Sequence, residues 1–328
     1  VDCDWSSDVC SSDLIFVCPG MELSRLLKVT PHWLKFVLSI PRNQPMTGTE
    51  AFTHWSSLLA YVLGGCTFLL APQLWQLILQ IELEGRSEGY LRLFGLALIN
   101  VGDILAIAAR SNHKFSRHQE CLTSVLARLI LVNCVVLAFI STDMLPFSFA
   151  LTFMVLDSLL ALIILLIWFL ESKDASLGSF FREIFQPFWQ FPAKENDGFT
   201  ITEFLLGIPQ FLIWLMMAVK PGYARQMFHL DAFQGHSDGY LAACFLLLSI
   251  QGLHHMVGAS NGNHCLNVYF VFGRIILNIP GFLILFLVGQ IERNLCLLLC
   301  ITDLSIFVVM LTSLLRELWR GTHSGRLD

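Results

Sequence analysis

The chain repeats itself after roughly 150 residues, and this repeat constrains the fold more than any single motif. The motif GRSEGYL at 85–91 returns as GHSDGYL at 235–241, and an Arg precedes an Asp by 29 residues in both copies. Further matches are Arg128 and Asp157 with Arg274 and Asp303, Thr47 and Glu50 with Thr200 and Glu203, and Ser111 and Asn112 with Ser260 and Asn261. The sequence therefore predicts a tandem duplication.

The composition predicts that the duplicated unit lies in a membrane. Hydrophobic residues make up 55% of the chain and charged residues 14%, against roughly a quarter in an ordinary soluble domain. About 20 helical residues cross a hydrocarbon core of roughly 30 Å. Eight stretches have this character: 51–72, 90–109, 122–141, 147–170, 201–219, 239–258, 267–288 and 295–315. We predict an all-α polytopic integral membrane protein, with eight transmembrane helices in two parallel four-helix repeats.

The expected organisation has six parts. Residues 1–20 resemble translated sequencing-adapter read-through, so they are set aside and Met21 is the expected start. The remaining parts are an N-terminal interfacial segment (21–46), the first repeat (47–171), a cytoplasmic interfacial linker (172–199), the second repeat (200–316) and a cytoplasmic tail (317–328). Aromatic and sparsely charged sequences at 26–40 and 180–189 are typical of helices that lie along a membrane surface.

Loop charges predict the orientation, because Lys and Arg in short loops favour the cytoplasmic side. One side has 13 such residues and the other has five. The first set is Arg25, Lys28, Lys35, Arg42, Arg110, Lys114, Arg117, Lys173, Arg182, Lys194, Arg316, Arg320 and Arg326; the second is Arg86, Arg92, Lys220, Arg225 and Arg293. Both termini are therefore expected in the cytoplasm, with the two repeats related by a pseudo-twofold axis along the membrane normal. Such an arrangement can place a pathway between the halves, or the duplication can have produced a larger bundle with none.

Several short motifs have structural explanations. Thr47 with Glu50, and Thr200 with Glu203, have the spacing of a capping box and predict helix starts. The motif at 85–91 and its copy suit a tight turn before a helix, with the Tyr at the membrane interface. Gly102 and its counterpart Gly252 predict close helix packing.

Charged residues within the spans are the strongest functional candidates. Each costs roughly 2.5–3.5 kcal/mol to insert, so each should face protein or water. These residues are Asp103, Arg128, Asp157, Arg274 and Asp303. The favoured interpretation is that Arg128 pairs with Asp157, and Arg274 with Asp303, although Asp103 lies at the right depth to pair with Arg128. The alternative places Asp157 and Asp303 together at the axis, where two carboxylates could handle a proton or cation.

In the second repeat Leu253 stands in place of Asp103, and His254 and His255 follow it, so Arg274 is expected either to face imidazoles or to snorkel inward. Adjacent helical residues point about 100° apart, which argues against both histidines binding one metal ion. The ten Cys residues show no CxxC pair and are expected to pack as small hydrophobes. No metal or cofactor is therefore predicted.

The four-span unit resembles the small DoxX-like membrane proteins. Tyr90, Leu91, Arg92, Leu93, Phe94 and Gly95, together with the basic loop 110–117, carry the resemblance. It covers about 120 residues per copy, and this chain departs from the family by having two copies. The resemblance implies a four-helix fold and transfers no catalytic residues.

Three functions are compatible with these features. The leading hypothesis is a non-enzymatic protein that transports or binds a small hydrophobic ligand or an ion between the repeats. The alternatives are a membrane-embedded enzyme acting on a lipid or redox carrier, and a membrane scaffold or assembly factor. The bilayer is the expected partner; no basic aromatic groove suggests nucleic acid, and the oligomeric state is left open.

Overall fold

The computed structural model describes residues 45–111, 114–191, 198–260 and 264–323. Within these ranges the regular structure is helical, with no strand. The first half contains α2 (Gly48–Ser56), η1 (Ser57–Leu63), α3 (Gly64–Leu70), α4 (Pro72–Leu79), α5 (Ser87–Ala108), α6 (Lys114–Leu126), η2 (Ala127–Val132), α7 (Asn133–Ser141), α8 (Phe147–Glu171) and α9 (Leu177–Gln190), where η denotes a π-helical segment. The second contains α10 (Gly198–Val219), α11 (Pro221–Phe228), α12 (Ser237–Ser260), α13 (His264–Gly273), η3 (Arg274–Asn278), α14 (Ile279–Leu287) and α15 (Arg293–His323).

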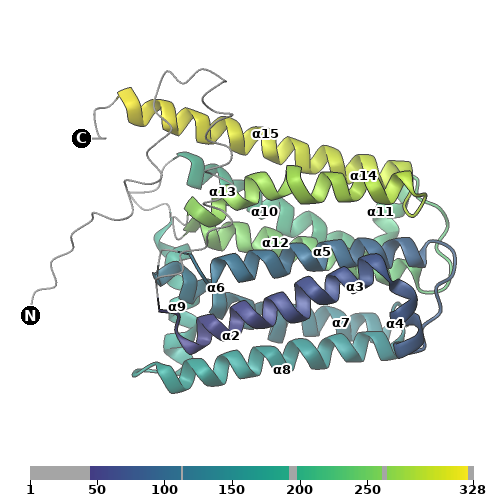
Figure 1. The fold of residues 1–328 in the computed structure, drawn as a ribbon, viewed down its shortest axis with the longest axis horizontal. Coiled ribbons are helices and arrows are strands. Elements are labelled where there is room, and N and C mark those ends of the chain that lie inside the picture. Colours follow the sequence, from purple (N-terminus) through teal and green to yellow (C-terminus); the bar gives the residue numbers. More distant parts are fainter. Residues whose placement is uncertain (1–44, 112–113, 192–197, 261–263, 324–328) are drawn as a thin grey trace, which may run out of the picture.

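The long helices lie side by side in one bundle (Figure 1). Seven helical stretches of the described chain are long and apolar enough to cross a membrane, and the bent pair Gly48–Leu70 and Pro72–Leu79 supplies an eighth. These stretches coincide closely with the eight predicted spans. The protein is an all-α polytopic membrane protein, as the composition predicted.

The first span ends at a sharp bend. The helix axis turns by 102° between Leu70 and Pro72, because Ala71 leaves the helical conformation and Pro72 starts a new helix. Proline suits this position, since a first-turn residue has no intrahelical partner for its N–H. The second half shows the same change at Lys220 and Pro221, where α11 follows α10.

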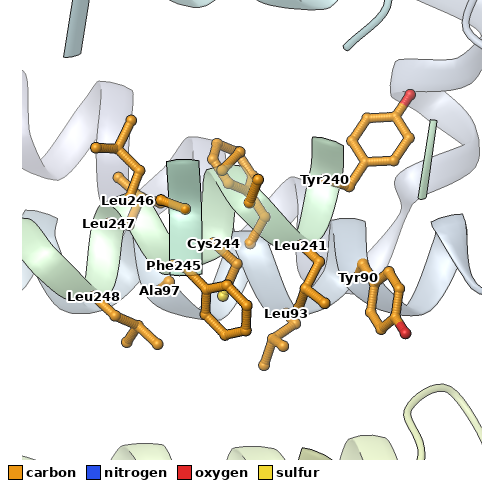
Figure 2. Packing of buried hydrophobic residues seen from close by; sticks show 14 of the residues in the cluster. Tyr90, Leu93, Ala97, Tyr240, Leu241, Cys244, Phe245, Leu246, Leu247 and Leu248 are labelled. Carbon is orange, nitrogen blue, oxygen red and sulfur yellow. The ribbon is translucent and has the colours of Figure 1, made fainter. Parts of the chain in front are cut away.

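The helices α5 and α12 form the centre of the bundle. Within their most apolar windows, 83% of α5 and 89% of α12 is buried, against 22% of α8 and 28% of α15. Figure 1 accordingly shows α8 and α15 on opposite sides of the central pair. Figure 2 shows buried side chains of α5 and α12 in the main core, among them Leu93, Ala97, Leu241 and Phe245.

Contacts between the halves occur in matching pairs. Gly85 approaches the side chain of Gln234, and its counterpart Gly235 approaches that of Glu84. Both glycines have positive φ, 55° and 53°, which favours glycine at these turns. In the same way, Gly89 lies against the backbone of Gln290, and Gly239 against that of Met144. The two connections to the last helices are therefore each held by the first turn of the other half's central helix.

Other local predictions had mixed outcomes. Thr47 and Glu50 form the predicted capping box, and Gly102 and Gly252 lie at close helix contacts. The second capping box is wrong, because α10 already includes Thr200.

The two motif tyrosines are covered by the rest of the bundle. Tyr90 and Tyr240 are both buried. The hydroxyl of Tyr90 donates to Glu292 at 2.6 Å, so this tyrosine also links the two halves.

A helix is present where the second surface segment was predicted. In α9, Phe180 and Ile184 are buried, whereas Phe181, Phe185 and Trp189 are exposed. The buried side packs on α6, where Gln119 donates to the Ile184 carbonyl at 2.7 Å. The exposed aromatic side is typical of a helix at a membrane surface. The other predicted surface segment, 26–40, lies outside the described residues.

The matching glycine contacts generate a stability prediction. Gly239→Ala is expected to destabilise by about 1–3 kcal/mol, because a methyl group there would overlap the Met144 carbonyl. Gly222→Ala is the control, since open space surrounds Gly222; it should leave stability unchanged or raise it by up to about 1 kcal/mol. Unfolding in detergent, followed by circular dichroism, measures both. Equal stability of the two variants would contradict the close contact.

Candidate functional site

The predicted intramembrane charges are mostly buried inside the bundle. Six of them are buried and Asp103 is half-buried; the buried ones are Arg128, Asp157, His254, His255, Arg274 and Asp303. The bundle therefore shields these groups from lipid, as their high insertion cost requires. What differs between the two halves is how their charges are paired.

In the second half both terminal nitrogens of the buried arginine are engaged. Arg274 forms the predicted ion pair with Asp303. Its Nη2 donates to Gln210 Oε1 at 2.8 Å and lies 2.7 Å from His255 Nε2, so Arg274 does face an imidazole. Asn278 donates to the other Asp303 oxygen at 2.7 Å. This cluster satisfies both charges and holds η3 against α10, α12 and α15.

In the first half the corresponding ion pair is missing. Asp157 accepts a hydrogen bond from the Tyr61 hydroxyl rather than from Arg128, so the predicted pairing is wrong here. The Asp103 carboxyl group interacts with the Tyr269 side chain of the other half. Arg128 lies over the Tyr61 ring, 4.8 Å from its centroid, and both of its terminal nitrogens are buried without a hydrogen-bond partner. Tyr61 of the first span thus donates a hydrogen bond to Asp157, and its ring packs against the Arg128 guanidinium.

Both buried arginines lie in π-helical turns. Arg128 is in η2 and Arg274 begins η3, each within the third span of its half. Tyr61 lies in a further π-helical segment, η1. Such segments are rare and frequently occur at functional sites. The sequences of η1 and η2 contain no proline or other signal that would predict a π-helical segment.

The two adjacent histidines bind different carboxylates. His254 Nδ1 lies 2.7 Å from Glu120 Oε2 of the first half, and His255 Nδ1 lies 3.2 Å from Glu203 Oε1. His254 Nε2 has no hydrogen-bond partner. Among the described residues, no three His, Cys, Asp or Glu side chains converge to hold a metal ion.

The sequence did not reveal that the carboxylates of Glu50 and Glu120 make buried contacts with charged or titratable side chains. Glu50 caps α2 through one oxygen, and its other oxygen accepts from Arg117 Nε at 3.0 Å, deep in the bundle. Arg117, counted above as a loop charge, is therefore buried. Glu120, Ser124 and Arg128 are spaced four residues apart, and this spacing on one helix face was the available signal.

Two small cavities lie near Arg128. Arg128 lines one of them, and Tyr61 and Asp157 line both. The first, about 20 Å³, is lined by Tyr61, Ser124, Arg128, Asp157 and His254, together with apolar residues from α5, η2 and α12. The second, about 40 Å³, is almost entirely apolar. Its lining includes Ala60, Phe94, Val136, Phe149, Phe153 and Leu246. Both cavities include Tyr61, Val132, Asp157 and Leu247, so the cavity beside Arg128 adjoins the apolar one between the halves.

A carboxylate pair at the axis is not observed. Asp157 lies in α8 and Asp303 in α15, and these helices are on opposite sides of the bundle (Figure 1). The central helices α5 and α12 lie between them and keep the two carboxylates apart. The hypothesis of a shared site is therefore wrong, and each Asp belongs to the cluster of its own half.

The chain matches no family model, no curated protein and no solved structure. The geometry of the site is therefore the basis for assigning a function. Its distinguishing feature is the contrast between the engaged Arg274 and the unpaired Arg128.

This contrast predicts unequal effects of two equivalent substitutions. Arg274→Met should destabilise by roughly 3–5 kcal/mol, because Asp303 loses its buried counter-charge. Arg128→Met should change stability by less than about 1 kcal/mol, or raise it, because no acceptor loses a partner. Unfolding in detergent micelles measures both variants. Equal losses would show that Arg128 is also a structural ion-pair partner.

Proposed function

We propose that this protein binds, and by binding can transport, a small ligand between its two halves, at a site centred on Arg128. The observation that carries the proposal is a buried guanidinium whose terminal nitrogens have no acceptor, beside a cavity lined from both halves. A buried charge is strongly disfavoured unless something pairs with it. A bound ligand supplies the missing partner.

We further propose that the halves arose by duplication of a four-span unit similar to DoxX-like proteins, with both termini in the cytoplasm. The same order of elements in both halves and the paired glycine contacts support duplication. After duplication, one copy can retain a structural role while the other acquires a ligand. The engaged Arg274 cluster and the unpaired Arg128 fit these two roles.

A scaffold is less well supported, because it calls for a filled interface between the halves. The interface here contains cavities and an unpaired charge, which reduce packing without strengthening the bundle. A site that must stay open to a ligand accounts for both features.

The binding function can be tested without knowing the ligand, by measuring whether a small reagent can enter the cavity. In a background with the ten native cysteines replaced, Val132→Cys should react with methyl methanethiosulfonate faster than Val135→Cys. Both valines are buried on the same span, but only Val132 lines the cavities. Mass spectrometry of the folded protein in detergent gives both rates. Equally slow reactions would indicate a closed interface and favour the scaffold.

A membrane-embedded enzyme is a second candidate, favoured by one observation. Glu120 orients His254 and leaves its Nε2 free, while the Ser124 hydroxyl lines the same cavity, which is the residue set of a nucleophilic hydrolase. The Ser124 hydroxyl donates to the Cys121 carbonyl at 2.7 Å, however, and makes no hydrogen bond to His254. Ser124 and His254 are thus not hydrogen-bonded to each other as a nucleophile and its base, and the binding function is the better supported of the two.

A fluorophosphonate probe distinguishes the two candidates. Since Ser124 lacks a hydrogen bond to a base, we expect no covalent labelling of the purified full chain. Ser124→Ala is the matched control for labelling at any other residue. Labelling that disappears in Ser124→Ala would establish an activated serine and place the enzyme first.

A further inference from the structure

We propose that the ligand of the Arg128 site is a small monocarboxylate anion, from formate to butyrate in size, an inference that rests on the binding function proposed above. The carboxylate contacts the guanidinium in the smaller cavity, which Arg128 lines. The short alkyl end occupies the adjoining apolar cavity. Charge, shape and available volume each lead to this class.

The charge of the ligand follows from the state of Arg128. Arginine stays protonated in proteins, so the buried side chain cannot escape its charge by losing a proton. Both terminal nitrogens lack acceptors, and the Tyr61 ring covers the guanidinium without neutralising it. The equivalent Arg274 receives a carboxylate from Asp303. A ligand carboxylate supplies the same chemistry to Arg128, and its two oxygens match the planar fork of the guanidinium.

The size of the ligand follows from the cavities. Their volumes are about 20 and 40 Å³, and a water molecule needs roughly 10–15 Å³ on this measure. The combined space holds only a few non-hydrogen atoms, which excludes long acyl chains and sterols. The aromatic and aliphatic lining of the larger cavity favours methyl and methylene groups. Each added methylene should tighten binding by roughly fourfold until the cavity is full.

Asp157 limits the charge that the ligand can carry. It lines both cavities, and it accepts from the Tyr61 hydroxyl instead of pairing with Arg128. Its carboxylate makes no hydrogen bond to the terminal nitrogens of Arg128, and it repels an incoming anion. A monoanion is therefore favoured over a dianion. Asp157→Asn should bind the monocarboxylate more tightly, because the amide keeps the size and an acceptor oxygen for Tyr61.

Saturation-transfer NMR on the purified full chain in detergent tests the ligand class. Sodium acetate, propionate, butyrate and octanoate are titrated at constant ionic strength, with propionamide as the neutral analogue of propionate. We expect binding at millimolar concentrations that improves from acetate to butyrate and is weaker for octanoate. Propionamide should not bind, and an equal concentration of chloride should not displace propionate. Equal binding of propionamide, or full displacement by chloride, would overturn the monocarboxylate.

Substitutions locate the binding. Arg128→Met should weaken propionate binding by roughly tenfold or more, since a charge-assisted hydrogen bond is lost, and Arg128→Lys should lie between Met and the native residue. Arg182→Met, which removes an exposed arginine from α9, is the control and should bind normally. Ala150→Val narrows the apolar cavity and should weaken butyrate more than acetate.

The outcomes separate the ligand class from the binding function. Undiminished binding in both Arg128 variants would overturn the assignment of the site, even if propionate binds elsewhere. Absence of any carboxylate binding, with Val132→Cys still reactive, would overturn the monocarboxylate and leave the binding function standing. Absence of both would overturn the two proposals together.

Discussion

A charged or polar group in the hydrocarbon core must find its partner within the protein, since no water is available there. This constraint explains why α5 and α12 are surrounded by the other helices. Buried groups such as Glu120, His254 and Arg274 lie on or beside the central pair and are shielded from lipid. The outer helices α8 and α15 present mainly apolar side chains outward and direct Asp157 and Asp303 toward the bundle. The arrangement of helices is thus also an arrangement for satisfying charges.

The two halves meet this constraint differently. In the second half, Gln210 occupies the first-span position and shares Arg274 with Asp303 and His255. In the first half, Tyr61 bonds Asp157 and its ring lies under Arg128. A tyrosine ring attracts the cation but offers the guanidinium nitrogens no strong acceptor. The residue at this first-span position is therefore one of the differences between the closed ion-pair cluster and the open site.

The open site belongs to both halves. Tyr61, Arg128 and Asp157 come from the first half, whereas Leu247 and His254 come from α12 of the second. The hydrogen bond between His254 and Glu120 joins the halves directly beside the cavity. A change in how the halves pack would therefore alter the cavity, and a ligand bound there would alter the packing. This linkage is the physical basis for the proposed binding function and for its proposed extension to transport.

The sequence by itself determined the membrane class, the eight spans, the turns at Gly85 and Gly235, and the burial of Arg128, Arg274, Asp157 and Asp303. These features depend on local composition and spacing, because span length is set by the bilayer and positive φ by the lack of a side chain. The pairing of Arg274 with Asp303 also followed, since two complementary charges recur at a fixed spacing. Only the tertiary structure decided that Arg128 stays unpaired. That outcome depends on Tyr61, 67 residues before Arg128, and on His254 and Glu120 meeting across 134 residues. Sequence separation does not show which side chain contacts a buried charge, because the packing of the helices determines which of the possible partners lies close enough.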